Sequence, residues 1–165
     1  MKVTPALLVL LVACAINESE EEPLRLNAAI VFPPRDTIRL SLPVTTYRCT
    51  NGSSLLMQAA SPEGSGVLVL LRYRERLGSA TFPVVPPEDP RDRGAVVVVR
   101  YSLREATHFF AFDSGSVQVT REGDKISGHI QGSGVQNAIH TPTTIDYHDV
   151  ELPGPADTAS CVVQR

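Results

Sequence analysis

The chain has 165 residues, a length typical of one domain, and 42% of them are hydrophobic, which is enough to form a buried core. Its formal net charge is −3, so it lacks the positively charged surface that nucleic-acid binding requires. Only 5% of the residues are aromatic and none is tryptophan, which also disfavours a carbohydrate-binding or single-strand-binding module. We therefore expect one globular domain that binds no nucleic acid.

The N-terminus has the features of an export signal. Lys2 supplies a positive charge, residues 6–12 are mainly apolar, and small Ala13 precedes Cys14. The apolar run is shorter than the stretch of about 20 residues that crosses a bilayer as a helix. We interpret residues 1–13 as a signal peptide.

The sequence Leu-Val-Ala-Cys that ends at Cys14 resembles the lipobox of bacterial lipoproteins. The resemblance implies a diacylglycerol on the Cys14 sulfur, cleavage before this residue and acylation of the new amine, so the membrane becomes a partner. In Gram-negative lipoproteins the next residue influences sorting. Ala15 is not the aspartate associated with inner-membrane retention, which implies the outer membrane.

Two other fates of the N-terminus stay open. Ala13, Cys14 and Ala15 also fit the small-x-small rule for soluble export, with cleavage after Ala15. The third alternative is an unprocessed cytoplasmic chain whose apolar start packs in the core.

Residues 14–34 read as the lipidated cysteine followed by a flexible acidic tether, because four glutamates occur between positions 18 and 22 and two prolines close the segment. Part of it, residues 30–32, is apolar enough to pair as an edge strand. The folded domain is expected to span residues 35–165.

Two cysteines remain once Cys14 is assigned to the lipid. An even number of cysteines in an oxidising compartment predicts a disulfide between Cys49 and Cys161. The alternative is a pair of buried free thiols.

The first half of the domain shows strand patterns in chain order. Residues 38–42 alternate apolar and polar side chains, as in a half-buried strand, and residues 55–60 form the next strand. Asn51-Gly52 between them suits a tight hairpin turn with positive φ at both central positions.

Two β-branched apolar runs, residues 67–71 and 95–99, are expected to be central strands. Residues 83–94 contain four prolines and five charges, so we expect an exposed loop. The short segment 103–107 is expected to be a bend between strands.

The clearest hairpin joins residues 116–121 to residues 125–131 through a turn at Gly123. On its second strand, Ile126 and Ile130 share one face. The stretch 115–128 resembles a hairpin that recurs in uncharacterised bacterial lipoproteins with β-sandwich or barrel domains.

Strands at residues 144–152 and 160–163 complete the expected set. Eight or nine strands without a sustained helical stripe predict an all-β fold, and we favour a single antiparallel β-sandwich over a small up-and-down β-barrel. Helix should be nearly absent.

The polar residues suggest few chemical sites. Asp146 and His148 share a strand face near His140 and His129, which is the best candidate for a metal site, although such residues are usually solvated or paired with each other.

His108, Asp113 and Ser116 contain the residue types of a hydrolytic triad but lie too close in sequence to converge. No nucleophile elbow, phosphate-binding loop or paired-cysteine metal motif occurs. Glycines at 128, 132 and 134 are expected to allow a bulge or bend.

We expect a non-enzymatic, lipid-anchored envelope module without a cofactor, whose loops contact an envelope protein or a small ligand. One alternative is a barrel that carries a small hydrophobic ligand, for which a cavity of several hundred Å³ would be diagnostic. Another is a soluble secreted β protein.

Overall fold

The computed structural model describes residues 24–32, 36–103 and 106–161, and within these ranges the chain forms strands and no helix. The strands in chain order are β1 (Arg25–Phe32), β2 (Asp36–Cys49), β3 (Ser54–Ala60), β4 (Gly66–Arg72), β5 (Ala80–Pro83), β6 (Gly94–Leu103), β7 (Ala106–Glu122), β8 (Lys125–Gln136), β9 (Ile139–Glu151) and β10 (Thr158–Ala159). The all-β prediction is confirmed for these residues.

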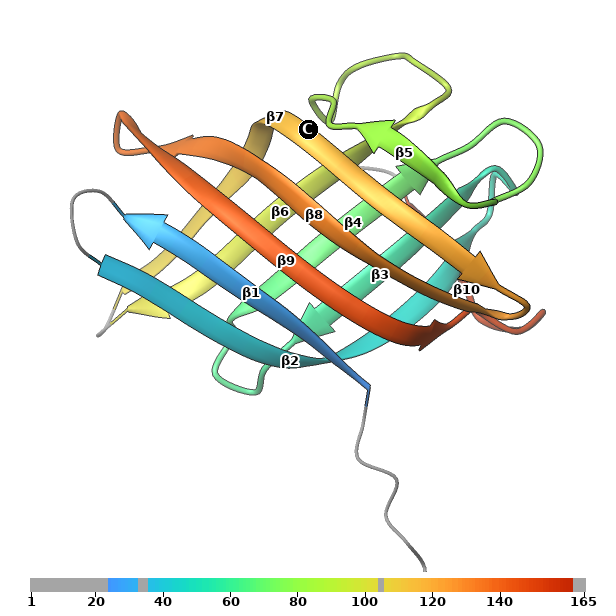
Figure 1. Ribbon diagram of the computed structural model, residues 1–165, viewed down its shortest axis with the longest axis horizontal. Coiled ribbons are helices and arrows are strands. Elements are labelled where there is room, and N and C mark those ends of the chain that lie inside the picture. Colours follow the sequence, from blue (N-terminus) through green and yellow to red (C-terminus); the bar gives the residue numbers. More distant parts are fainter. Residues whose placement is uncertain (1–23, 33–35, 104–105, 162–165) are drawn as a thin grey trace, which may run out of the picture.

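The sheet closes on itself as a barrel (Figure 1). Its order is β1-β9-β8-β7-β6-β4-β3-β2, and β2 then pairs with β1, with every pair in this ring antiparallel. This arrangement agrees with the barrel alternative. The sandwich that we favoured is not confirmed, because sequence periodicity shows which residues face a core but not whether the two outer strands meet.

The strand β7 changes its partner along its length. Its first part, up to Ala111, pairs with β6, whereas residues 116–119 pair with β5. The change follows a bulge between Phe112 and Ser114 and Gly115, whose φ is +130°. A side chain at Gly115 would lie 2.2 Å from the carbonyl oxygen of Gln131, so only glycine fits this bend.

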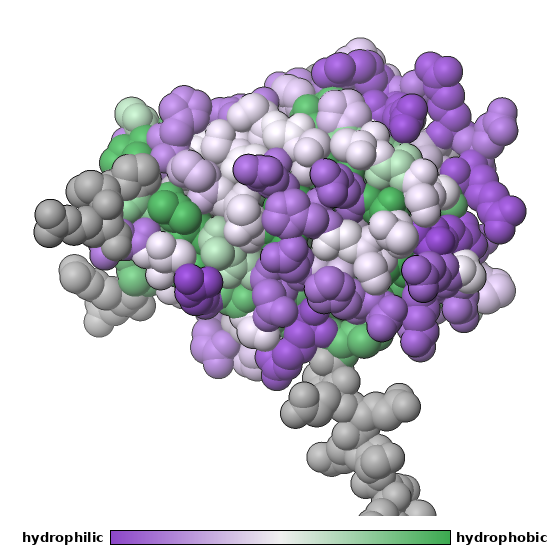
Figure 2. Space-filling view, viewed as in Figure 1, coloured by the Kyte–Doolittle hydropathy of each residue, from purple (hydrophilic) through white to green (hydrophobic). Residues whose placement is uncertain are grey.

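The two ends of the barrel differ in polarity. The β7–β8 end carries the connections at 50–53, 73–79 and 123–124, and hydrophilic residues gather there (right in Figure 2). The opposite β8–β9 end carries the connections at 61–65 and 137–138 and has exposed large hydrophobic side chains, namely Val31, Leu103, Phe109, Val135 and Ile139.

Side chains fill the interior of the barrel. The inward positions alternate along each strand, and those of β4 and β6, such as Val69, Leu71, Val97 and Val99, have 0% exposure. A side chain beside a void large enough for water would retain accessible surface. These residues therefore border a packed core.

The inward-facing glycines of β8 make room for aromatic rings. A Cβ at Gly132 would lie 2.5 Å from the Phe112 ring, and one at Gly134 would lie 2.6 Å from the Phe110 ring. The two rings stack with centroids 6.0 Å apart. The glycines thus serve mainly to admit large side chains into a narrow barrel.

A second apolar cluster lies on the outside of the barrel. Leu70 and Val96 face outward but are buried beneath Val85 from the proline-rich loop. Arg72 fastens this loop by donating to the carbonyl oxygens of Pro87 and Asp89. The expectation that residues 83–94 form an exposed loop is therefore wrong at its start, because Val84 and Val85 pack against neighbouring strands.

Two further expectations need correction. The tether predicted to reach residue 34 is wrong over β1, which pairs on both edges and buries Leu26 and Ile30; its glutamate-rich part lies outside the described residues. In the β2–β3 turn only Gly52 has positive φ, and its N–H bonds to the carbonyl of Cys49, so the connection is longer than the predicted two-residue turn.

Replacing Gly132 by alanine should destabilise the barrel. The new methyl group would meet the Ser114 carbonyl oxygen at 2.4 Å and the Phe112 ring, and we expect a loss of about 1–3 kcal/mol from overpacking. Urea unfolding followed by circular dichroism measures this loss. The control is Gly78→Ala, where nothing lies within 4 Å and the expected change is below about 0.5 kcal/mol. Equal stability of both variants would contradict the assignment.

Candidate functional site

A pocket of about 630 Å³ opens at the β7–β8 end of the barrel. Its apolar part is formed by Leu55, Leu77 and Leu152, and the ring of Tyr73 borders it. Five charged side chains line it too, namely Arg48, Arg76, Arg121, Glu75 and Asp124. A mouth with an apolar floor and a few convergent polar groups is a usual place for a ligand in a barrel protein.

Strand alternation explains why these side chains meet. Arg48 follows Thr46 by two positions on β2, Tyr73 follows Leu71, and Arg121 follows Val119 on β7. Because inward-facing residues repeat every second position, each of the three continues an inward row beyond the core and points into the mouth. We call Arg48, Arg76 and Arg121 with Tyr73 the arginine mouth.

The connection 73–79 closes the interior at this end. Leu77 in this connection is buried and belongs to the main core. Arg121 holds it there, since its Nη1 donates to the Leu77 carbonyl oxygen at 2.7 Å and its backbone N–H donates to Ser79 Oγ at 2.8 Å. The pocket therefore lies above a plug and outside the packed interior.

The positive charges of the arginine mouth act on the pKa of Tyr73. Partial burial raises the pKa of the Tyr73 hydroxyl, while the positive charges of Arg48 and Arg121 act in the opposite direction. Two guanidinium groups therefore lie close enough to influence the same hydroxyl. No ion pair within 4.0 Å joins the arginines of the mouth to Glu75 or Asp124 in the described part of the chain.

The histidines considered for a metal site lie elsewhere, on the outer faces of β8 and β9. His129 Nδ1 and Asp146 Oδ1 are 2.6 Å apart and form a cross-strand pair. His140 lies 3.9 Å from Asp113. No group of three metal-ligating side chains occurs among the residues that the structure describes.

The residues considered for a triad are also separated. His108 faces the interior at the β8–β9 end, where its ring stacks on Tyr101 at 5.1 Å, while the exposed Asp113 accepts a hydrogen bond from Ser114. Ser116 lies beyond the bulge, where β7 pairs with β5. The three do not form a hydrogen-bonded chain.

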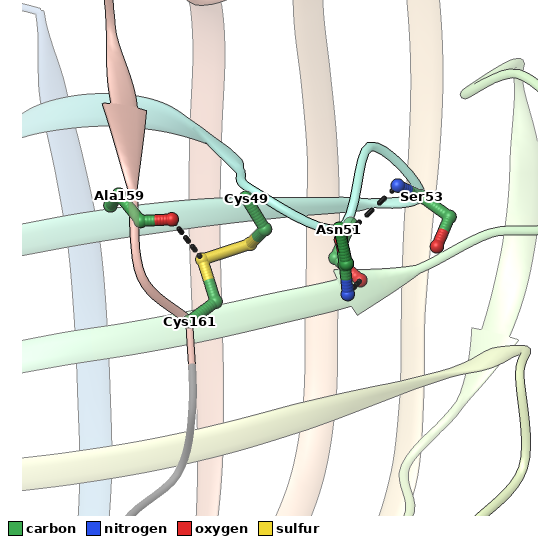
Figure 3. The surroundings of a disulfide bond; sticks show 6 residues. Cys49, Asn51, Ser53, Ala159 and Cys161 are labelled. Atoms are coloured by element: carbon green, nitrogen blue, oxygen red, sulfur yellow. Dashed lines mark hydrogen bonds between the residues drawn. A yellow bond between two sulfur atoms is a disulfide. The ribbon is translucent and has the colours of Figure 1, made fainter.

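Cys49 and Cys161 form a disulfide, as the sequence predicted (Figure 3). Their Cα atoms are 5.4 Å apart, and the bond connects the end of β2 to the segment after β10. β10 pairs in parallel with residues 48–49 of β2, slightly before the last strand predicted from sequence. Cys14, the predicted lipidation site, lies outside the described residues.

Removing the disulfide by Cys49→Ser with Cys161→Ser should cost about 2–5 kcal/mol, because the bond spans 112 positions and limits the unfolded chain. Thermal unfolding of the variant and of the reduced protein measures this. Cys14→Ser is the control, which should leave the midpoint unchanged. Equal midpoints with and without reductant would contradict a stabilising role.

The arginine mouth was not predicted from the sequence. The run 67–71 was expected to be a central strand, but its inward alternation was not extended past the strand end, where Tyr73 lies. The same alternation, continued along β2 and β7, leads to Arg48 and Arg121. No pattern in the neighbouring sequence places Arg76, in the β4–β5 connection, at the mouth.

No helix in the described ranges is long and apolar enough to cross a membrane. Comparison with known protein families found no model that matches the chain, and comparisons with curated proteins and solved structures found no similar protein.

Proposed function

We propose that the chain is an exported envelope protein, anchored to the outer membrane through lipid on Cys14, whose barrel is a non-enzymatic binding module. The observation that carries the binding role is the open arginine mouth above a filled interior. Ligand recognition is thereby assigned to the β7–β8 end and the loops around it. An envelope protein partner that contacts these loops belongs to the same proposal.

The N-terminal sequence supports the anchor. Leu11 to Cys14 has the lipobox pattern, and the disulfide between the other two cysteines is what an oxidising compartment favours. Residues 15–23 can span at most about 30 Å between the lipid and Leu24. The Leu24 carbonyl oxygen accepts a hydrogen bond from the Val44 N–H of β2, four residues before Arg48 of the arginine mouth. The proposed site would therefore stay near the membrane surface.

The packed interior separates this proposal from the carrier alternative. A carrier of a hydrophobic ligand needs an internal cavity of several hundred Å³, whereas the central side chains of β4 and β6 border no void of water size. At the β8–β9 end, Phe32, Tyr101 and His108 pack together and obstruct entry. These contacts favour binding outside the barrel.

Replacing Cys14 by serine should abolish lipid attachment and release the protein from membranes or block its processing. Fractionation of bacterial cells and intact-mass analysis of the native chain measure both effects. Cys161→Ser is the matched control, since it makes the same substitution at a cysteine of the disulfide and should keep the lipid mass. A mature, lipid-free chain that begins at Ile16 would support the soluble secreted alternative and refute the anchor.

A crosslinking pull-down with the lipidated protein in envelope membranes tests the partner. We expect recovery of a protein crosslinked at the connections of the β7–β8 end. Crosslinks confined to the β8–β9 end would contradict the assigned face. Recovery of no partner would count against the protein-partner form of the proposal and leave its small-ligand form.

A further inference from the structure

We infer that the arginine mouth binds a small amphiphilic oxyanion, a carboxylate or phosphate carried on an apolar body. This inference deepens the proposed function, since it names the ligand class of the same site. It rests on three guanidinium groups that converge beside an apolar floor at the barrel mouth.

The charge of the mouth is opposite in sign to that of the chain. Three arginines and two acidic residues line the pocket, which leaves one excess positive charge, whereas the whole chain carries −3. A local excess of positive charge in a concave site attracts anions even when the protein as a whole is acidic.

The guanidinium groups have unused donors. Arg121 uses Nε for the Gly123 carbonyl and Nη1 for the Leu77 carbonyl, which fixes its position and leaves Nη2. The side chains of Arg48 and Arg76 make no hydrogen bond to another described residue. One fixed and two unpaired guanidinium groups suit a planar carboxylate or a phosphate, which accept paired N–H donors.

The apolar residues of the pocket indicate that the ligand has an apolar part beside its anionic group. Half-buried Leu152 and Tyr73 contribute apolar surface to the pocket, and Leu55 lies beneath it with 2% exposure. A volume of about 630 Å³ accommodates a molecule of cofactor size or the head and first methylenes of a lipid. An inorganic ion alone would leave this surface exposed to water.

Nuclear magnetic resonance titration of the full chain, purified from whichever cell fraction contains it, tests the inference. The probes are hexanoate, hexyl phosphate and, as the uncharged control, hexanol. We expect saturable shifts of the Gly52, Leu77 and Gly154 amides with at least one anion and much weaker shifts with hexanol. Because the preparation does not depend on lipidation, loss of the anchor and loss of anion binding are separate results.

Arg48→Gln with Arg76→Gln should weaken anion binding about tenfold, since about 1.4 kcal/mol of charge-assisted hydrogen bonding is lost. Both side chains are exposed, so the fold should be retained. Arg39→Gln, on a distant part of β2, is the control for loss of a positive charge outside the mouth and should bind like wild type. Equal affinity of the double variant and wild type, or hexanol binding as tightly as the anions, would overturn the inference.

Phosphatidylglycerol and phosphatidylcholine vesicles separate the two sources of the oxyanion. Shifts with soluble anions and no preference between vesicles assign a free ligand. A preference for phosphatidylglycerol that the double variant loses assigns a lipid headgroup. Absence of saturable shifts with every anion and both vesicles would overturn the inference for either source.

Discussion

The pairing of β1 on both edges holds the rest of the structure together. β1 joins β9 on one side and β2 on the other, and without it the ring would be an open sheet with two exposed strand edges. Open edges are a liability because their unpaired N–H and C=O groups can pair with other chains. Closure also turns one face of every strand inward, so the alternate residues on that face together form one core.

Closure of a ring of this size leaves little space, and the sequence matches that limit. Glycines on β8 face the large rings of Phe110, Phe112 and Tyr147, so small and large inward residues complement each other across neighbouring strands. The Tyr147 hydroxyl still donates to the Gln118 carbonyl, and burial raises the pKa of this tyrosine. With the interior occupied in this way, binding chemistry is left to the rims, and at the β7–β8 rim the inward rows end in charged residues.

The two rims illustrate how position along an inward row changes the role of a residue. At the β7–β8 end the rows finish in Arg48, Tyr73 and Arg121, whereas at the β8–β9 end they finish in Leu103 and Ile139. The same alternation therefore produces a charged mouth at one end and an apolar rim at the other. An asymmetry of this kind gives the molecule two chemically distinct faces without any insertion.

Much of the fold was predictable from local patterns. The alternation at residues 38–42, the β-branched runs of β4 and β6 and the hairpin of β7 with β8 all gave correct strands, and the cysteine count gave the disulfide. The closure was not predictable, because β1 follows a glutamate-rich segment and its partner β9 lies at the far end of the sequence. The arginine mouth was missed for a related reason, since its residues come from separate strands and meet only after closure.

The long-range ring has a consequence for how the chain reaches its native state. Leu26 pairs with Tyr147, and Cys49 bonds to Cys161, so the contacts that complete the fold have a high contact order. Such topologies fold slowly, because the entropy of closing large loops is lost before those contacts form. A chain that emerges N-terminus first would hold β1 paired with β2 alone, without β9 on its other edge, until synthesis was nearly finished. During that interval the central hairpins can form locally, and the apolar face of β1 would be the segment most in need of protection from aggregation.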